Sequence, residues 1–324
     1  FYSAGIHTNH GLYATLYSFP AMMKRNLMKG SVIPRYSGLP TVLKENGYYN
    51  LFFMTHEGQY DNMNAFFRTN GYDEVFSQEN YPADKVVNSF GVQDDFLYDY
   101  AIPVLNQRAA TGQPFFATLL SISNHPPYVI PPFFHPKTSE PETQIVEYAD
   151  WALRKFFEEA RKQPWFDNTI FVLEGDHGKL VGDAECELPE SYNHIPLMIY
   201  SSRIHPEEKN TFGGQVDIQP TILGLLNIDY LQNNFGVDLL KEERPCMFYT
   251  ADNMIVGRND TLLYLYNYET QQEFTYHIDN GKLKAVPMDD RFLPLKEYSF
   301  SMLQSAEFLV KHGKTVNSVP FTQQ

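Results

Sequence analysis

The stretch from Thr169 to Lys179 constrains the fold of this chain more than any other. Ile170 to Leu173 is a short β-branched and apolar run, typical of a buried parallel strand, and a glycine, Asp176 and His177 follow it closely. Open α/β sheets bind ligands at the carboxyl ends of their strands. Two side chains that can bind a metal therefore stand where such a sheet would place a site.

Two other predicted strands end beside a histidine. Tyr49 to Thr55 is followed by His56, and Phe115 to Ser121 is followed by His125. The second of these runs is almost wholly apolar, which predicts a central position in the sheet. His194 stands at the entrance of a further predicted strand. Strands that alternate with helices predict an α/β fold, with a mostly parallel central sheet and helices on both faces.

The helical segments fit this pattern. The strongest helix signal covers Thr143 to Lys162, where apolar residues recur at helical spacing and Pro164 follows. Another helix is predicted from His7 to Tyr17, with Thr8 as its N-cap residue. Free amides and the positive end of the helix dipole meet at such a hydroxyl, so an anionic phosphoryl or sulfuryl group would be held there.

The last part of the chain has a different pattern. Alternating residues predict antiparallel strands at Leu262 to Tyr268 and Glu273 to Ile278, and a helix is expected near Phe300 to His312. We therefore predict a catalytic domain at residues 1–228. A smaller α+β subdomain, with an antiparallel sheet and a helix, is predicted at residues 229–324.

Charge and composition exclude several partners. The chain has 25 Lys+Arg and 39 Asp+Glu, a net charge of -14 that repels a phosphate backbone, so nucleic acid is not an expected partner. The sequence has no apolar run long enough to predict a membrane span. It opens without a leader, and its first residues resemble the middle of a domain, so we expect a longer parent protein. Cys186 and Cys246 match no metal or disulfide pattern, which leaves their pairing open.

The polar residues suit one type of reaction. A divalent metal bound by Asp176 and His177 would activate the Thr8 hydroxyl, otherwise a poor nucleophile, and would neutralise charge on a phosphoryl or sulfuryl oxygen. Mixed oxygen and nitrogen ligands fit Zn²⁺ or Mn²⁺ better than Ca²⁺. His125 would bind substrate oxygens or serve the leaving group.

Five short motifs, in this order, resemble one known family. They are His7-Thr8-Asn9-His10-Gly11 with Phe19-Pro20, Ser121-Ile122-Ser123-Asn124-His125-Pro126-Pro127, Glu174-Gly175-Asp176-His177-Gly178, His194-Ile195-Pro196-Leu197, and Gln215-Val216-Asp217-Ile218-Gln219-Pro220-Thr221. From Thr8 to about Asn227 the chain is similar to the sulfatase-like branch of the alkaline phosphatase superfamily, and within it to the lipoteichoic acid synthase and phosphoglycerol transferase group.

The resemblance assigns roles to individual residues. It implies that Thr8 is the nucleophile and a metal ligand, that Asp176 and His177 are two further metal ligands, and that His125 is an active-site histidine. We expect the substrate to be bound by three further residues, namely His56, Asp61 and His194.

The resemblance also implies a cofactor, partners and a location. One divalent metal is expected, Mn²⁺ first, with Zn²⁺ or Mg²⁺ as alternatives. The substrate would be a phospholipid or a glycan. An amino-terminal membrane anchor would hold the domain at the extracytoplasmic face of the bacterial cytoplasmic membrane. The first strand of the family and its metal-binding glutamate are expected before Phe1.

Two departures from the family pattern refine the expected function. Lipoteichoic acid synthases hold glycerol phosphate with a tryptophan and an arginine, but this chain has Tyr60-Asp61-Asn62-Met63, and the acidic Asp61 favours an amine such as ethanolamine or a sugar hydroxyl. The C/S-x-P-x-R signature of true sulfatases is absent, which makes a sulfuric ester hydrolase the weaker alternative.

We therefore expect a metal-dependent phosphotransferase or hydrolase. It would move a phosphoglycerol or phosphoethanolamine head group through a phosphothreonine at Thr8. An alternative of another class is a non-catalytic binding module on the same fold. A strand that ends in Glu or Asp before Phe1 would favour the enzyme.

Overall fold

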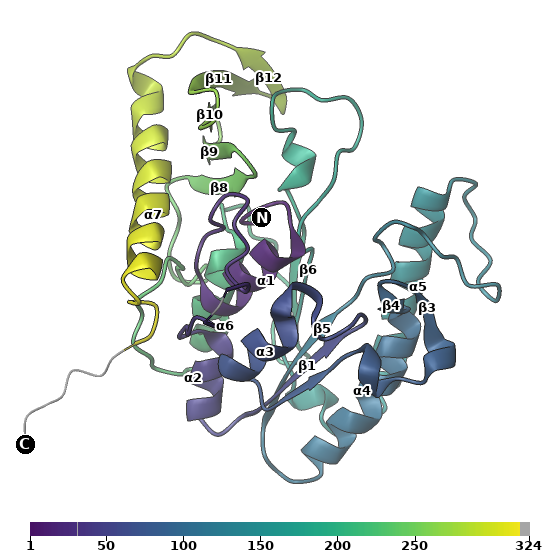
Figure 1. Cartoon of the computed structure of the whole chain (residues 1–324). Helices are drawn as coiled ribbons and strands as arrows, with labels where there is room; N and C mark the ends of the chain where they lie inside the picture. Colours follow the sequence, from purple (N-terminus) through teal and green to yellow (C-terminus); the bar gives the residue numbers. More distant parts are fainter. Residues whose placement is uncertain (31, 318–324) are drawn as a thin grey trace, which may run out of the picture. The chain divides into compact units, whose positions relative to one another are not determined.

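The computed structural model describes residues 1–30 and 32–317, and their contacts divide the chain into two compact units (Figure 1). The first unit contains Phe1–Leu39, Phe171–Tyr200 and the described residues from His205 onward. The second contains Pro40–Ile170 and Ser201–Ile204.

A three-stranded parallel sheet is the centre of the second unit. Its order is β2-β1-β5, formed by Glu74–Phe76, Tyr49–Met54 and Phe115–Leu120. The central strand β1 is buried from its second residue onward, because apolar side chains cover both of its faces. The strand predicted at Tyr49 to Thr55 is thereby confirmed.

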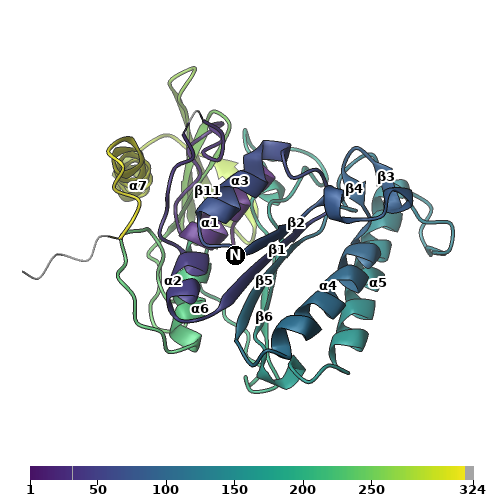
Figure 2. The same ribbon diagram turned by 60° about the horizontal axis from the view of Figure 1, so that its bottom comes forward.

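Two long helices accompany this sheet. The helix α4 (Asp94–Ala109) packs against α5 (Pro141–Ala160) and against β1 and β5, and Figure 2 shows the two helices side by side. The helical spacing of Ile145, Ala152 and Phe156 predicted α5, and these side chains are buried. The other elements assigned around this unit are α2 (Leu39–Glu45), η1 (Tyr60–Asn62), α3 (Met63–Thr69), η2 (Gln78–Asn80), η3 (Ala83–Lys85), β3 (Val86–Asn88), β4 (Gly91–Val92) and η4 (Phe166–Asn168).

In the first unit, α1 (Thr8–Tyr17) packs against α6 (Ile218–Leu225). Both helices are mostly buried. The strand β6 (Phe171–Glu174) pairs with β7 (Leu197–Tyr200). Two short helices complete this part, and they are η5 (Glu190–Tyr192) and η6 (Gln215–Asp217).

The first unit also contains a five-stranded antiparallel sheet, with the order β12-β11-β10-β9-β8. The strands are β8 (Met247–Ala251), β9 (Met254–Arg258), β10 (Leu262–Asn267), β11 (Gln272–Asp279) and β12 (Lys282–Ala285). After η7 (Asp290–Phe292), the helix α7 (Leu293–Lys311) packs on β8 and β9 (Figure 1). The predicted antiparallel strands and final helix are confirmed, and Asn280 and Gly281 form the turn between β11 and β12 with φ of 48° and 75°.

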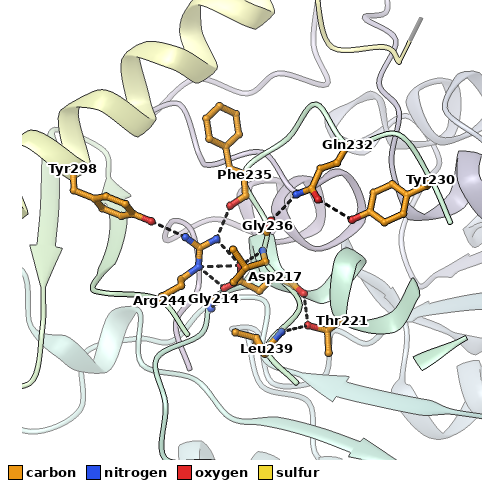
Figure 3. Close-up of polar contacts among 11 residues, drawn as sticks. Gly214, Asp217, Thr221, Tyr230, Gln232, Phe235, Gly236, Leu239, Arg244 and Tyr298 are labelled. Carbon is orange, nitrogen blue, oxygen red and sulfur yellow. Dashed lines mark hydrogen bonds and ion pairs between the residues drawn. The ribbon is translucent and has the colours of Figure 1, made fainter. Parts of the chain in front are cut away.

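A buried ion pair joins the family-like part of the chain, which is the part that resembles the sulfatase-like family, to the C-terminal part. Figure 3 shows the guanidinium of Arg244 against the carboxylate of Asp217, the carbonyl of Phe235 and the hydroxyl of Tyr298. The side chains of Arg244 and Asp217 are 2% and 0% exposed. Asp217 also accepts hydrogen bonds from the amides of Gly214 and Val237. These contacts lie within one unit, and the domain boundary near residue 228 stays a prediction.

Two details of the predicted sheet are wrong. The strand β6 pairs antiparallel with β7 and its four residues are partly exposed, although its apolar run predicted a buried parallel strand. In the three-stranded sheet β1, not β5, is the central strand. An apolar run does not determine which strand lies beside it, so both errors in strand pairing have the same origin.

The structure answers whether the two cysteines pair and whether a helix could cross a membrane. Cys186 and Cys246 are free thiols, and burial raises the pKa of each to about 11. Among residues 1–30 and 32–317, the structure contains no helix with the length and apolar character needed to cross a membrane.

Candidate active site

Thr8 is the first residue of α1, and the extended residue His7 precedes it as the N-cap (φ -131°, ψ 146°). The prediction that Thr8 is the N-cap is therefore wrong by one position. The Thr8 hydroxyl does not cap the helix but donates a hydrogen bond of 2.6 Å to Oδ2 of Asp176. The helix thus directs its first hydroxyl at the carboxylate that the sequence singled out.

Asp176 and His177 follow the end of β6 directly after Gly175. Asp176 Oδ1 accepts a hydrogen bond from the backbone amide of His177 at 2.9 Å. Its other oxygen, Oδ2, takes the Thr8 hydroxyl and lies 3.5 Å from Nε2 of His177. One carboxylate oxygen is therefore in reach of both a hydroxyl and an imidazole nitrogen, and the roles of the three residues as metal ligands stay a prediction.

The orientation of His177 suits a metal ligand. Its Nδ1 contacts the carbonyl oxygen of Gly178 at 2.8 Å. Since a carbonyl only accepts, Nδ1 carries the hydrogen, so in the neutral form of the ring, which a metal requires, the lone pair of Nε2 points towards Asp176 Oδ2. Two lone-pair atoms that face each other are stabilised by a cation between them, and metal-binding histidines are commonly held through their other ring nitrogen. The donor atoms present therefore fit a divalent metal.

These donors fill only part of a coordination sphere. Thr8, Asp176 and His177 supply three donor atoms, whereas Zn²⁺ takes four ligands and Mn²⁺ more. Within the part of the chain that the structure describes, no three His, Cys, Asp or Glu side chains form a group that could hold a metal ion. A complete site would therefore need further ligands, such as substrate oxygens, water or a carboxylate of the kind expected before Phe1.

Gly11 and Gln215 hold the loop that carries Asp176 in place. A Cβ atom on Gly11 would lie 2.5 Å from the backbone oxygen of Asp176, so α1 approaches the Asp176 backbone this closely only because residue 11 has no side chain. The buried amide of Gln215 donates to the same oxygen at 2.8 Å and accepts from the amide of Ala4 at 2.8 Å. The loop that carries Asp176 is thus fixed by two separate segments.

Two histidines that the sequence analysis left without a role lie beside Thr8. The Nε2 atom of His7 is 2.7 Å from Oδ1 of Asp252, at the β8–β9 turn. His10 is 3% exposed, and burial lowers its pKa to about 4. The rings of His7 and His10 make an edge-to-face contact with centroids 5.0 Å apart. The signal for His7 is only its position before Thr8, because Asp252 is remote in sequence.

The second unit gathers the other two predicted histidines at one edge of its sheet. Met54 at the end of β1 lies opposite Leu120 at the end of the parallel strand β5, so the segments with His56 and His125 leave the sheet at the same edge. His56 contacts the ring of Tyr60, Tyr60 contacts Phe90, and Phe90 contacts His125, with centroids 4.6, 6.3 and 4.2 Å apart.

The environments of these two histidines differ. His56 is 2% exposed, and burial is the main cause that lowers its pKa. His125 is exposed, and its Nδ1 lies 2.6 Å from the carbonyl oxygen of Pro126. Their roles in binding and proton transfer stay predictions.

The other two predicted substrate residues, Asp61 and His194, lie in different units. Asp61 has a left-handed backbone (φ 51°, ψ 17°) in η1 of the second unit. His194, in the first unit, is exposed and stacks on the ring of Tyr2 with centroids 5.0 Å apart, and burial lowers its pKa. The Tyr2 contact gives His194 a packing partner, and its role in substrate binding stays a prediction.

The fold belongs to the alkaline phosphatase superfamily, which confirms the predicted fold class. A protein of this superfamily from Vibrio parahaemolyticus has a crystal structure that matches with a TM-score of 0.87 and 25% identity, over 98% of this chain and 79% of that chain. The lipoteichoic acid synthase LtaP from Listeria monocytogenes matches with a TM-score of 0.80 and 23% identity, over 96% of this chain and 83% of that chain. The second likeness concerns the fold alone.

The chain belongs to the Sulfatase family, whose sequence profile matches residues 1–228. Lipoteichoic acid synthase 1 of Bacillus subtilis is 26% identical over 274 residues, which are 77% of this chain and 41% of that protein. Lipoteichoic acid synthase of Staphylococcus saprophyticus is 26% identical over 235 residues, 64% of this chain and 35% of that protein.

These matches confirm the predicted resemblance, and they identify the chain as part of a sulfatase-like enzyme, from a superfamily whose members generally depend on divalent metals. The chain spans only about two fifths, or less, of the length of these curated relatives.

Proposed function

We propose that the chain is the catalytic domain of a metal-dependent phosphotransferase or hydrolase that forms a phosphothreonine at Thr8. One observation carries this proposal: the Thr8 hydroxyl donates a 2.6 Å hydrogen bond to Asp176, whose carboxylate also lies beside His177. Similarity to lipoteichoic acid synthases supports a phosphoglycerol or phosphoethanolamine head group as the transferred unit.

In the first half-reaction, Oγ1 of Thr8 attacks the phosphorus of a phosphodiester. The bond from phosphorus to the departing alcohol breaks as the Oγ1–P bond forms, and the hydroxyl proton leaves along the hydrogen bond to Asp176. The departing oxygen takes up a proton, for which we keep the predicted acid His125. A divalent ion held by Thr8, Asp176 and His177, with Mn²⁺ as our first choice, would neutralise charge on the phosphoryl oxygens.

In the second half-reaction, an acceptor hydroxyl or water attacks the phosphothreonine. The P–Oγ1 bond breaks, the attacking group loses its proton, and the Thr8 oxygen regains one. A hydroxyl acceptor makes the enzyme a transferase, and water makes it a hydrolase. The chain itself supplies the same groups in both cases.

We further propose that the substrate is a phospholipid presented at the extracytoplasmic face of the membrane, with the parent protein anchored there. Asp61, an acidic residue where lipoteichoic acid synthases have cationic and aromatic partners for glycerol phosphate, favours a head group with an amine or a hydroxyl. A sulfuric ester hydrolase has less support, because Thr8 is followed by Asn9, His10 and Gly11 and not by the signature that sulfatases modify.

The test is the intact mass of the purified protein after incubation with Mn²⁺ and vesicles of phosphatidylglycerol or phosphatidylethanolamine. We expect an adduct on the wild-type protein, with the mass of one phospho-head-group, and none on Thr8→Ala. An inactive protein without adduct or bound metal would favour the non-catalytic binding module. Full turnover in Thr8→Ala would exclude the covalent mechanism.

A further inference from the structure

The C-terminal sheet reaches the residue that precedes the candidate nucleophile. Asp252 is the first of the two residues that join β8 to β9, and its Oδ1 atom lies 2.7 Å from Nε2 of His7. Asp252 lies outside residues 1–228, the part that matches the Sulfatase family. A side chain from beyond the family-like part therefore contacts the start of α1.

The position of Asp252 is fixed by a strand and not by a free loop. The amide of Thr250 donates to the carbonyl of Ala4 at 3.0 Å, and the Thr250 hydroxyl donates to the carbonyl of Ala21 at 3.3 Å. All five residues of β8 are buried. These bonds hold β8 against the segment that leads into α1, so Asp252 and His7 meet through a defined register. Side chains on such rigid elements are oriented more accurately than side chains on loops.

The contact does little for stability. The side chains of His7 and Asp252 are each 49% exposed, and exposed pairs of this kind contribute little to the free energy of folding because water screens them. The same exposure leaves the imidazole accessible to a substrate. The consequence of the contact is therefore the orientation of an accessible ring next to Thr8.

The contact also selects the ring nitrogen that remains available. A carboxylate only accepts, so Nε2 of His7 carries the hydrogen and donates to Asp252. Nδ1 is therefore the ring nitrogen that remains open to a ligand. A free ring nitrogen in this position suits a hydrogen bond with a polar group of the substrate.

We infer that His7 contacts the polar head group of the substrate through Nδ1, and that Asp252 is its positioning residue. The inference rests on the proposed function, since the group that His7 contacts belongs to the phosphoester that Thr8 attacks. It makes the C-terminal sheet a part of the active site.

The kinetic test compares Asp252→Ala, Asp252→Asn and His7→Gln on phosphatidylglycerol and phosphatidylethanolamine vesicles with Mn²⁺. We expect Asp252→Ala and His7→Gln to raise KM about tenfold with a smaller change in kcat, the size of a lost charge-assisted hydrogen bond. Asp252→Asn, which still accepts from His7, should recover most of the affinity. Wild-type KM in Asp252→Ala, in an enzyme that turns over, would overturn the inference.

A matched control is available in the same sheet. Glu269 is an exposed carboxylate paired with Lys24 at 3.1 Å, so Glu269→Ala removes the same charge and a similar exposed pair without touching His7. We expect its KM to equal that of the wild type. A rise in KM equal to that of Asp252→Ala would show a general charge effect and would also overturn the inference.

A second measurement separates this inference from the phosphothreonine mechanism. Nitrogen-15 NMR of the histidine rings, assigned with His7→Gln, should show the hydrogen of His7 on Nε2 and its redistribution in Asp252→Ala. Addition of glycerol 3-phosphate or phosphoethanolamine should shift Nδ1 of His7 in the wild type. That shift without any Thr8 adduct would retain the inference and reject the covalent step, whereas its absence would reject the inference.

Discussion

The hydroxyl of Thr15 donates a hydrogen bond of 2.5 Å to Oε1 of Glu174. Thr15 lies about two turns after Thr8 in α1, so both hydroxyls are on one face of the helix. Their partners Glu174 and Asp176 stand on either side of Gly175 at the end of β6. Two threonine–carboxylate bonds therefore join α1 to β6, and together they fix the rotation of the helix that presents Thr8.

Thr15→Val should weaken this connection between α1 and β6. Valine keeps the shape of threonine but leaves Oε1 of Glu174 without its donor, while Oε2 is already buried without a hydrogen-bond partner. We expect a loss of about 1–3 kcal/mol of unfolding free energy, measured by urea denaturation. Thr69→Val is the control, since the exposed Thr69 hydroxyl bonds only to Ala65 of its own helix. Equal losses of unfolding free energy in the two variants would show that the hydrogen bond to Glu174 stabilises the protein no more than the exposed bond at Thr69.

Gly11→Ala should destabilise the protein although alanine is the better helix former. Propensity favours alanine by about 1 kcal/mol, but the new Cβ atom would meet the Asp176 backbone oxygen at 2.5 Å. We expect a net loss of about 1–3 kcal/mol from overpacking, together with weaker Mn²⁺ binding by calorimetry. For comparison, a Cβ on Gly175 would meet the Ile195 side chain at 3.4 Å and the His177 backbone oxygen at 3.8 Å, both ordinary contacts, so Gly175→Ala should retain its stability. A stable Gly11→Ala protein would show that α1 can shift away from the Asp176 backbone without loss of stability.

The sequence predicted the parts of the site that depend on local signals. Thr8 opens a helix, and Asp176 and His177 follow a strand, so each could be placed from a few neighbouring residues. The order of the motifs then gave the fold class. The N-cap assignment of Thr8 failed because its hydroxyl is engaged by Asp176, and a tertiary contact of this kind overrides the local capping preference.

The contacts that the sequence did not predict depend on long-range register. Asp252 meets His7 only because Thr250 of β8 is hydrogen-bonded to Ala4, and no local pattern encodes that pairing. Arg244 pairs with Asp217 across the predicted boundary for the same reason. Strand neighbours were misjudged likewise, since the apolar run of β6 is compatible with a parallel or an antiparallel partner.

Asp217→Asn should be among the most destabilising single substitutions in the chain. Asparagine has the shape of aspartate but leaves the charge of Arg244 uncompensated, and that guanidinium is almost fully buried. We expect a loss of about 3–5 kcal/mol in urea or thermal unfolding. Glu159→Gln, which breaks the exposed pair with Lys162, should cost less than about 0.5 kcal/mol. A small effect of Asp217→Asn would mean that water reaches Arg244.

The two buried histidines should make the protein less stable in mild acid. Burial lowers the pKa of His56 and lowers the pKa of His10 to about 4, so both rings are harder to protonate in the folded protein than in the unfolded chain, where the ordinary value is 6.5. As the pH falls from 7 to 5, these two histidines take up protons more readily in the unfolded chain than in the folded one, so unfolding becomes more favourable. Each unit of pKa lowering corresponds to about 1.4 kcal/mol once the pH is below both values.

The contribution of His56 can be isolated with His56→Phe, which keeps an aromatic ring against Tyr60 and removes the titrating group. Urea denaturation from pH 7 to pH 5, with a chelator present, should give a smaller fall in unfolding free energy for the variant than for the wild type. His312 is exposed at the end of α7, and His312→Phe should leave the wild-type pH dependence intact. If His56→Phe keeps the full pH dependence, His56 takes up its proton as readily in the folded protein as in the unfolded chain.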